Sequence, residues 1–306
     1  MFVLPVFTIV IVYVPRDLAD GRVQRGRRNG NERYFVMVRI KSILKWAFIG
    51  LILAFIYFPI LFLTVNSFNE SDHIQNWTGF SLDHYAYFFD FENEPIRVVG
   101  QTFLLALVVA LLSTVLGTVG AIGIFYSKKK TGSALTAVNR IPVINADVVT
   151  AISFALLVSF LNIDKSTYIP LVLGQMLVCT PFVVLSVIPK LRQMDNNLYE
   201  AALDLGASPK KALFSVIIPQ ILPGIVSGFL LSVTLSLDDY VIAAYTKPDS
   251  FSTISTHIYG LDKNNIMGAQ IKAAYWAFTA IIFFAIVLVV VFSNVIAYKK
   301  SRSKKR

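Results

Sequence analysis

The sequence contains little cysteine, histidine or charge. Its 306 residues include one cysteine and three histidines, and charged residues make up 15% of the chain. The single Cys179 lies inside an apolar block, which excludes an intrachain disulfide, a CxxC redox pair and a cysteine-based zinc site. We interpret it as a packed residue. His73, His84 and His257 lie far apart without supporting cysteine or carboxylate spacing, so we expect no metal site.

Acidic residues are also scarce. The sequence contains 18 acidic and 28 basic residues, which gives a formal net charge of +10. A nucleic-acid-binding protein would gather such an excess in one basic patch. Here the basic residues instead flank apolar blocks, in groups at residues 128–130, 190–192 and 299–306. This is the positive-inside pattern of membrane proteins. We therefore expect a lipid bilayer around the chain and no nucleic acid as a partner.

Long apolar runs dominate the sequence, and hydrophobic residues make up 56% of it. A helix needs about 20 apolar residues to cross a bilayer. Six blocks meet this requirement, at residues 46–65, 101–126, 134–160, 168–188, 218–245 and 273–298. The first half of the third block is crowded by Asn139, Arg140, Pro142, Asn145 and Asp147. We predict an all-α integral membrane protein with six transmembrane helices.

The loops between the blocks predict an orientation. If the N-terminal side of the first span is cytoplasmic, every basic cluster falls on the cytoplasmic side, including the segment 190–211. Residues 69–97, 162–167 and 247–272 then face outwards, and they mix acids, amides and scattered bases without a basic run. We predict a multi-pass protein of the cytoplasmic membrane with both termini in the cytoplasm.

The first 36 residues differ from the rest. Residues 1–14 are apolar but too short to span, and residues 16–33 are rich in glycine and arginine with nothing to bury. A signal peptide would carry its charge before the apolar region, not after it. Met37 and the basic segment after it form an ordinary cytoplasmic start. We expect residues 1–36 to be an untranslated or unstructured extension and residues 37–306 to form one transmembrane domain.

The predicted cytoplasmic segment between the fourth and fifth spans has helix boundaries of its own. Residues 200–205 are good helix formers, and Gly206 suits a helix C-terminus. Ser208 followed by Pro209 is typical of an N-cap with proline in the first helical position. Glu200 and Asp204 lie four residues apart, which places both carboxylates on one helix face. We predict a helix, a turn and a second short helix before the chain re-enters the membrane near Pro219.

The same segment carries a family motif. Glu200-Ala201-Ala202, then three residues, Gly206, nine residues and Val216-x-Ile218-Pro219 resemble the EAA loop of the permease subunits of binding-protein-dependent ABC importers. The resemblance implies the type I ABC importer permease fold, with a cytoplasmic coupling helix between the fourth and fifth transmembrane helices. It also implies that this helix docks on the nucleotide-binding subunit. The residues implied in coupling are Glu200, Ala201, Ala202, Asp204, Gly206 and Ser208.

Four further segments are similar to the spermidine/putrescine permeases of that family. They are Asn66-Ser67-Phe68-Asn69, Trp77-Thr78-Gly79-Phe80, residues 145–153 and residues 235–243, and the similarity extends from about Met37 to the end. The family usually carries proline at the position of Ala146, which implies a break in the third span there.

Three carboxylates fall within the predicted spans, at Asp147, Asp238 and Asp239, with Tyr240 next to the pair. Carboxylates inside a membrane are costly and mostly functional. A polyamine needs spaced anionic partners and aromatic walls, so we assign these four residues to the substrate pathway. We place Asp147 about a turn or two inside the membrane. The alternatives are helix capping or an ion pair of Asp147 with Arg140 at i, i+7. Because Asp238 and Asp239 point about 100° apart on a helix, we expect one of them to tie the helix to a neighbour.

The sequence lacks the common nucleotide-binding and catalytic motifs, which favours a transport subunit over a membrane enzyme. Residues 117–120, Gly-Thr-Val-Gly, lack the lysine of a phosphate loop, so we expect no cofactor in this chain and ATP with Mg²⁺ on a partner. No HExxH, GxSxG or paired-histidine pattern supports a membrane enzyme. The resemblance implies a second, PotB-like permease, a PotA-like ATPase dimer and a PotD-like extracytoplasmic polyamine-binding protein as partners. A related importer for iron, thiamine or an opine is the alternative.

Overall fold

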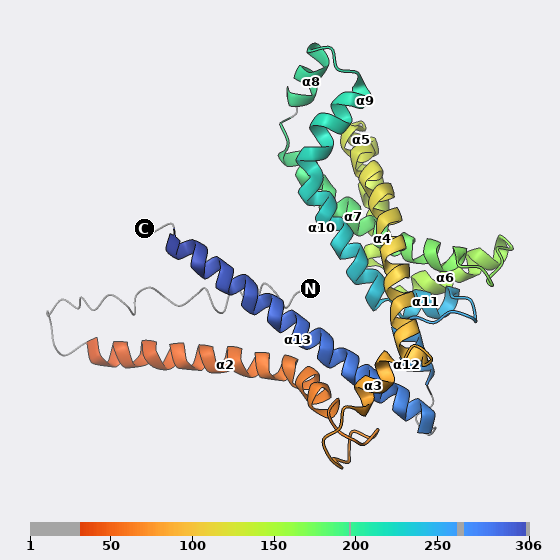
Figure 1. The fold of residues 1–306 in the computed structure, drawn as a ribbon. Coiled ribbons are helices and arrows are strands. Elements are labelled where there is room, and N and C mark those ends of the chain that lie inside the picture. The colour runs from red at the N-terminus through yellow and green to blue at the C-terminus, as the bar shows by residue number, and fades with distance from the viewer. Residues whose placement is uncertain (1–30, 196, 262–265, 304–306) are drawn as a thin grey trace. The chain divides into compact units, whose positions relative to one another are not determined.

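The computed structural model describes residues 31–195, 197–261 and 266–303. Their regular structure is helical (Figure 1), apart from an isolated bridge between Asn69 and Phe80. The prediction for residues 1–36 falls mostly outside the described residues, and the first described helix, α2, begins at Asn31. The chain divides into two compact units, residues 1–90 with 263–306, and residues 91–262.

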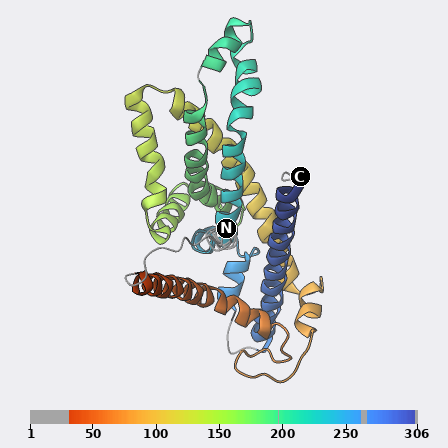
Figure 2. The same ribbon diagram turned by 90° about the vertical axis from the view of Figure 1, so that its left-hand side faces the viewer.

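The first unit contains the two terminal spans. Its helices are α2 (Asn31–Asn66), α3 (Asp83–Phe89) and α13 (Ile266–Ser303), and α13 contacts both others (Figure 2). The Phe88 ring stacks on Phe278 at a centroid distance of 5.3 Å. Segments Leu44–Asn66 and Met267–Ser293 are long and apolar enough to cross a membrane, as predicted for the first and sixth spans. Phe55 is 81% exposed, as expected of a lipid-facing side chain.

The second unit holds the other spans and both predicted sites. Its elements are α4 (Glu94–Tyr126), α5 (Lys129–Ile144), α6 (Asp147–Phe160), α7 (Ile169–Gln193), α8 (Asn197–Asp204), α9 (Pro209–Ala212), the π-helical turn η2 (Leu213–Ile217), α10 (Ile218–Asp238), α11 (Val241–Thr246) and α12 (Ile254–Gly260). Helices α4, α7 and α10 pack on one another and form the core. Five helices of the described residues can span a membrane, and the bent pair α5 and α6 makes a sixth if it is one broken span.

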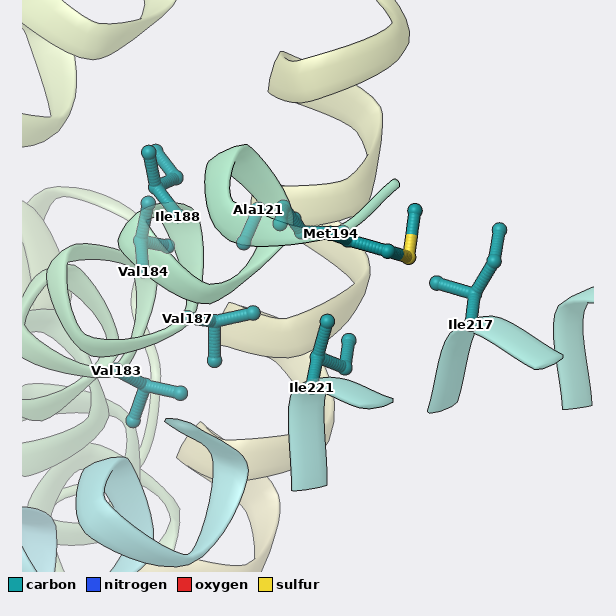
Figure 3. Packing of buried hydrophobic residues seen from close by; sticks show 9 residues of the cluster. Ala121, Val183, Val184, Val187, Ile188, Met194, Ile217 and Ile221 are labelled. Carbon is teal, nitrogen blue, oxygen red and sulfur yellow. The ribbon is translucent and has the colours of Figure 1, made fainter. Parts of the chain in front are cut away.

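The core depends on a close approach of α4 to α7. Buried valines of α7 belong to one hydrophobic cluster with Ala121 of α4 and Ile221 of α10 (Figure 3). A Cβ atom built on Gly117 would lie 2.6 Å from Cβ of Val183, so only glycine allows this spacing. Small residues commonly permit such backbone approach where helices pack in membranes.

We predict that Gly117→Ala lowers the thermal stability of the protein. The added methyl group has no space, and overpacking costs about 1–3 kcal/mol. Gly123 lies in the same helix, and a Cβ there meets nothing within 4 Å, so Gly123→Ala is the matched control. Melting of the purified protein in detergent measures both variants. Equal melting temperatures for Gly117→Ala and the wild type would contradict this account of the packing.

The third predicted span is broken. Helices α5 and α6 meet at an angle of 106°, so the block 134–160 is not one continuous helix. Asn145 and Ala146 between them are extended, and the Asn145 side-chain amide donates to Thr150 Oγ1 at 3.1 Å. The break implied near Ala146 is therefore confirmed. Pro142 already lacks an amide hydrogen one turn earlier, which weakens the end of α5.

The break overturns one interpretation of Asp147. Arg140 lies in α5 and Asp147 begins α6, so the two residues do not share a helix face at i, i+7. No ion pair joins them among the described side chains. Asp147 is exposed at the first position of a helix, rather than one or two turns inside a continuous span.

The fifth span differs from its prediction at both ends. It was expected at residues 218–245, but the helical course already begins at Pro209 and ends at Asp238. Asp239 and Tyr240 interrupt the helix, and α11 restarts at Val241. The predicted short helix before the membrane is therefore not separate from the fifth span, because α9, η2 and α10 follow each other without a gap.

Candidate functional site

The segment between α7 and α9 presents a short exposed helix. In α8 the side chains of Glu200 and Asp204 are exposed one helical turn apart, as predicted, and Ala201 is exposed beside them. Leu205 directly after the helix is 89% exposed. A large apolar side chain beside two carboxylates and a bare alanine surface is typical of a docking surface for another protein.

The turn after α8 has the geometry that the sequence predicts. Gly206 has a φ of +84°, the left-handed region that favours glycine. The Gly206 amide donates to the Leu203 carbonyl at 2.9 Å, and the Ala207 amide donates to the Ala202 carbonyl at 3.0 Å. These two bonds form a Schellman motif, which satisfies carbonyls that the helix end leaves free. The prediction that Gly206 ends this helix is confirmed.

The next helix begins as its residues predict. The Ser208 side chain accepts a hydrogen bond from the Lys211 amide at 3.4 Å, and Pro209 occupies the first helical turn. At the π-turn, the Ile218 amide donates to the Leu213 carbonyl, five residues back. Pro219 has no amide hydrogen to continue the regular pattern, which favours this wider turn. Ile217 and Ile221 are buried on either side of Pro219, so the turn is packed against the core.

A carboxylate junction, formed by Asp239, Gln175 and Ser236, lies at the other end of α10. Asp239 caps α10, and its carboxylate accepts hydrogen bonds from the amides of Ile242 and Ala243 in α11, at 3.1 and 3.0 Å. It also accepts from Nε2 of Gln175 in α7 at 3.0 Å. Oε1 of Gln175 accepts from the Ser236 hydroxyl at 2.6 Å. Asp239 is therefore the member of the acidic pair that ties α10 to its neighbours.

Gln175 is a site residue that the sequence reasoning missed. Its side chain is 1% exposed and joins α7 to both Ser236 and Asp239. The available signal was its position, since it is the only amide side chain in an otherwise apolar block at 168–188. A polar group in such a block needs an internal partner, because lipid offers none.

The other predicted pathway residues lie around this junction. Asp147 starts α6, which packs against α11, the short helix that follows Asp239. Asp238 is exposed at the end of α10. Tyr240 is 38% exposed, and its ring lies against Tyr259 of α12 at a centroid distance of 4.5 Å. The structure therefore places Asp147 on a helix that packs against α11, while Asp238 and Tyr240 lie on either side of Asp239 in the chain.

The chain matches a known family over most of this unit and beyond it. Residues 114–304 match the model of the binding-protein-dependent transport system inner membrane components. The chain belongs to this family. It is thus a permease component of a membrane transport system.

Similar proteins cover most of this permease. It is 31% identical over 223 residues to the spermidine/putrescine transport system permease protein PotC of Haemophilus influenzae, covering 73% of this chain and 86% of the relative. It is 30% identical over 224 residues to the putrescine transport system permease protein PotI of Escherichia coli K12, covering 70% and 79%. A bacterial ABC transporter involved in the import of the acidic polysaccharide alginate has a similar fold, with a TM-score of 0.59 at 19% identity, covering 88% of this chain and 99% of that one. The permease therefore has the fold of an ABC importer permease.

We predict that Asp239→Asn destabilises the permease, whereas Asp238→Asn does not. An amide at position 239 has a single acceptor oxygen, so it leaves a buried donor of Gln175 or α11 without a partner. Such a loss costs about 1–3 kcal/mol. Asp238 is exposed and serves as the matched control for the loss of one charge. Melting temperatures in detergent measure both variants, and an equal shift in the two would contradict the assigned tie.

Proposed function

We propose that this permease forms half of the translocation pathway of an ATP-driven importer of polyamines such as spermidine and putrescine. The similar proteins PotC and PotI are permeases of spermidine/putrescine and putrescine transport systems. The observation in this chain that supports a cationic substrate is the pair of exposed carboxylates at helix ends, Asp147 at the start of α6, which packs on α11, and Asp238 at the end of α10, next to Asp239.

The chemistry of this region suits a chain of ammonium groups. Exposed carboxylates attract ammonium ions without holding them by a rigid set of hydrogen bonds, so a substrate is free to leave again. The paired rings of Tyr240 and Tyr259 offer aromatic faces, and such faces attract cations and pack against methylene groups. Asp239 is already satisfied by three donors, so we assign it to positioning rather than to direct substrate contact.

We assign energy coupling to α8. Its exposed Glu200, Ala201 and Asp204, with Leu205 after them, would dock on the ATPase of the complex, which hydrolyses ATP with Mg²⁺. The Gly206 turn and the Ser208 cap hold α8 at a set angle to α9. This assignment places α8 and both termini in the cytoplasm, in agreement with the basic clusters beside the spans.

The same assignment implies the remaining partners. A second, PotB-like permease would supply the other half of the pathway, since buried polar groups and carboxylates at membrane depth need an enclosing protein surface. A PotA-like ATPase dimer would receive α8, and a PotD-like binding protein would deliver polyamine on the outer face.

Uptake by proteoliposomes that carry the complete complex tests the proposed function. With ATP inside and the binding protein outside, we expect accumulation of labelled spermidine or putrescine, and none with ADP in place of ATP. Iron, thiamine and an opine are assayed in the same vesicles. Accumulation of one of these without any polyamine uptake would assign the permease to a different importer.

A further inference from the structure

A pocket lies away from the carboxylate junction, at the end of the spans that is next to α8. A cavity of about 580 Å³ opens between the C-terminal ends of α4 and α7 and one face of α5. The end of α7 leads directly into α8, so the pocket lies on the same side of the permease as the coupling helix. Neither the carboxylate pathway nor the docking of α8 uses its residues.

The pocket carries a concentrated positive charge. Lys129 and Arg140 of α5 and Arg192 of α7 line it, and none of the described lining residues is acidic. Within the part of the chain that the structure describes, these three side chains form no ion pair. Three like charges around one cavity repel each other, and an anion inside it relieves that repulsion.

The helix geometry places Lys129 and Arg192 at the same end of the pocket. Asn139 of α5 donates to the Pro181 carbonyl of α7 at 3.3 Å, while Lys129 and Arg192 line the same pocket further along. The two helices are therefore antiparallel, and Arg140 starts deeper in the span than Arg192. Side chains on a helix slope towards its N-terminus, and a long arginine extends its charge to the membrane interface. The positive charge therefore extends along the pocket, from Lys129 and Arg192 at its outer end to Arg140 further in.

The remaining walls suit a ligand that is anionic at one end and apolar at the other. Phe125 and Ile188 line the pocket beside the basic groups. Lys128 caps α5 without a side-chain hydrogen bond, so the first amides of α5 add donors at the same end. The side-chain hydroxyl of Ser133 lines the cavity one turn further along. Basic pockets between transmembrane helices on the cytoplasmic side suit lipid headgroups.

We propose that this pocket binds the phosphate group of an anionic phospholipid, with the acyl chains along the apolar walls. Zwitterionic lipids carry the same phosphate, but their ammonium group would meet three cations. The bound lipid would link α5 to the end of α7, and α5 leads through the break at Ala146 to Asp147. The bound lipid would thereby connect the end of the permease next to α8 with the proposed substrate pathway.

Native mass spectrometry of the intact complex tests this proposal with phosphatidylglycerol and phosphatidylcholine as probes. We expect a phosphatidylglycerol adduct on the wild type, and a loss of about tenfold or more in Arg140→Gln/Arg192→Gln. Lys128→Gln/Lys130→Gln removes the same amount of charge from the start of α5, from residues that do not line the pocket, and should keep the adduct. Equal loss in both double variants, or equal binding of both lipids by the wild type, would overturn the proposal.

Further variants and a phosphate competition distinguish an electrostatic lipid site from other causes of adduct loss. Arg140→Lys/Arg192→Lys retains both charges and should retain the adduct, and its loss would overturn an electrostatic site. Should the glutamine double variant fail to assemble, Arg140→Gln against Lys130→Gln makes the same comparison. Excess inorganic phosphate should leave the adduct in place, and displacement would assign the pocket to a free anion. These readouts need no transported substrate, so they are independent of the polyamine assignment.

Discussion

Gly206→Val should strongly reduce ATP-driven uptake, while Gly206→Asn should retain most of it. Gly206 has a φ of +84°, and a Cβ built there meets nothing within 4 Å, so only the backbone conformation limits substitution. A β-branched residue is strained in this region by about 1–2 kcal/mol, a factor of about 5–30 in the population of the native turn. Asparagine tolerates the same conformation. The α8 helix of the valine variant would then lose its set angle to α9.

The measurement is substrate-stimulated ATP hydrolysis together with uptake in proteoliposomes that carry the complete complex. Both should fall together in Gly206→Val, and the amount of assembled complex in the membrane should not change. The asparagine variant controls for the added side chain. Full stimulation in the valine variant would show that the turn after α8 does not carry the coupling.

Asp147→Asn should reduce polyamine uptake by about tenfold or more while the complex still assembles and hydrolyses ATP. The substitution keeps the shape of the side chain and removes its charge. Losing one ammonium contact of about 1.4 kcal/mol corresponds to a tenfold change. Because Asp147 is exposed and makes no described ion pair, its charge is free to meet a passing substrate.

Asp249→Asn provides the control, since Asp249 is exposed in the same unit but lies beyond α11 in a separate pocket with Lys165 and Lys247. Uptake by this variant should equal that of the wild type. Wild-type uptake by Asp147→Asn would instead make Asp147 structural, with its charge stabilising the N-terminus of α6. Uptake of labelled spermidine at several concentrations separates weaker binding from slower transport.

The local features of this permease could be predicted from its sequence, because neighbouring residues determine them. Each of the six predicted apolar runs overlaps one of the five spanning helices or the bent pair of α5 and α6. The turn at Gly206 and the cap at Ser208 follow from residue types within a few positions. The break between α5 and α6 was expected from the family pattern, although Ala146 itself has no preference that requires it.

The carboxylate junction could be predicted only in part, because distant residues complete it. Nothing between Asp238 and Val241 forces a helix to end, since this stretch contains neither glycine nor proline. The end of α10 is stabilised by Gln175, 64 positions away, and by the amides of α11 that Asp239 caps. The local sequence therefore predicts a longer fifth helix than the structure has, and it indicates Asp239 without its partner Gln175.

The fifth span is helical without a gap from Pro209 to Asp238, so a tilt at one end displaces the other end. Its 30 residues extend for about 45 Å at 1.5 Å per residue. A tilt of about 5° at the α8 end therefore displaces the far end by about 4 Å, more than a hydrogen bond can stretch. Because Asp239 and Ser236 fasten that end to α7 and α11, a tilt of this size either moves the three helices as one block or breaks the Gln175 bonds. The same fastening thus sets how far a displacement at the α8 end travels along α10 before the carboxylates change their surroundings.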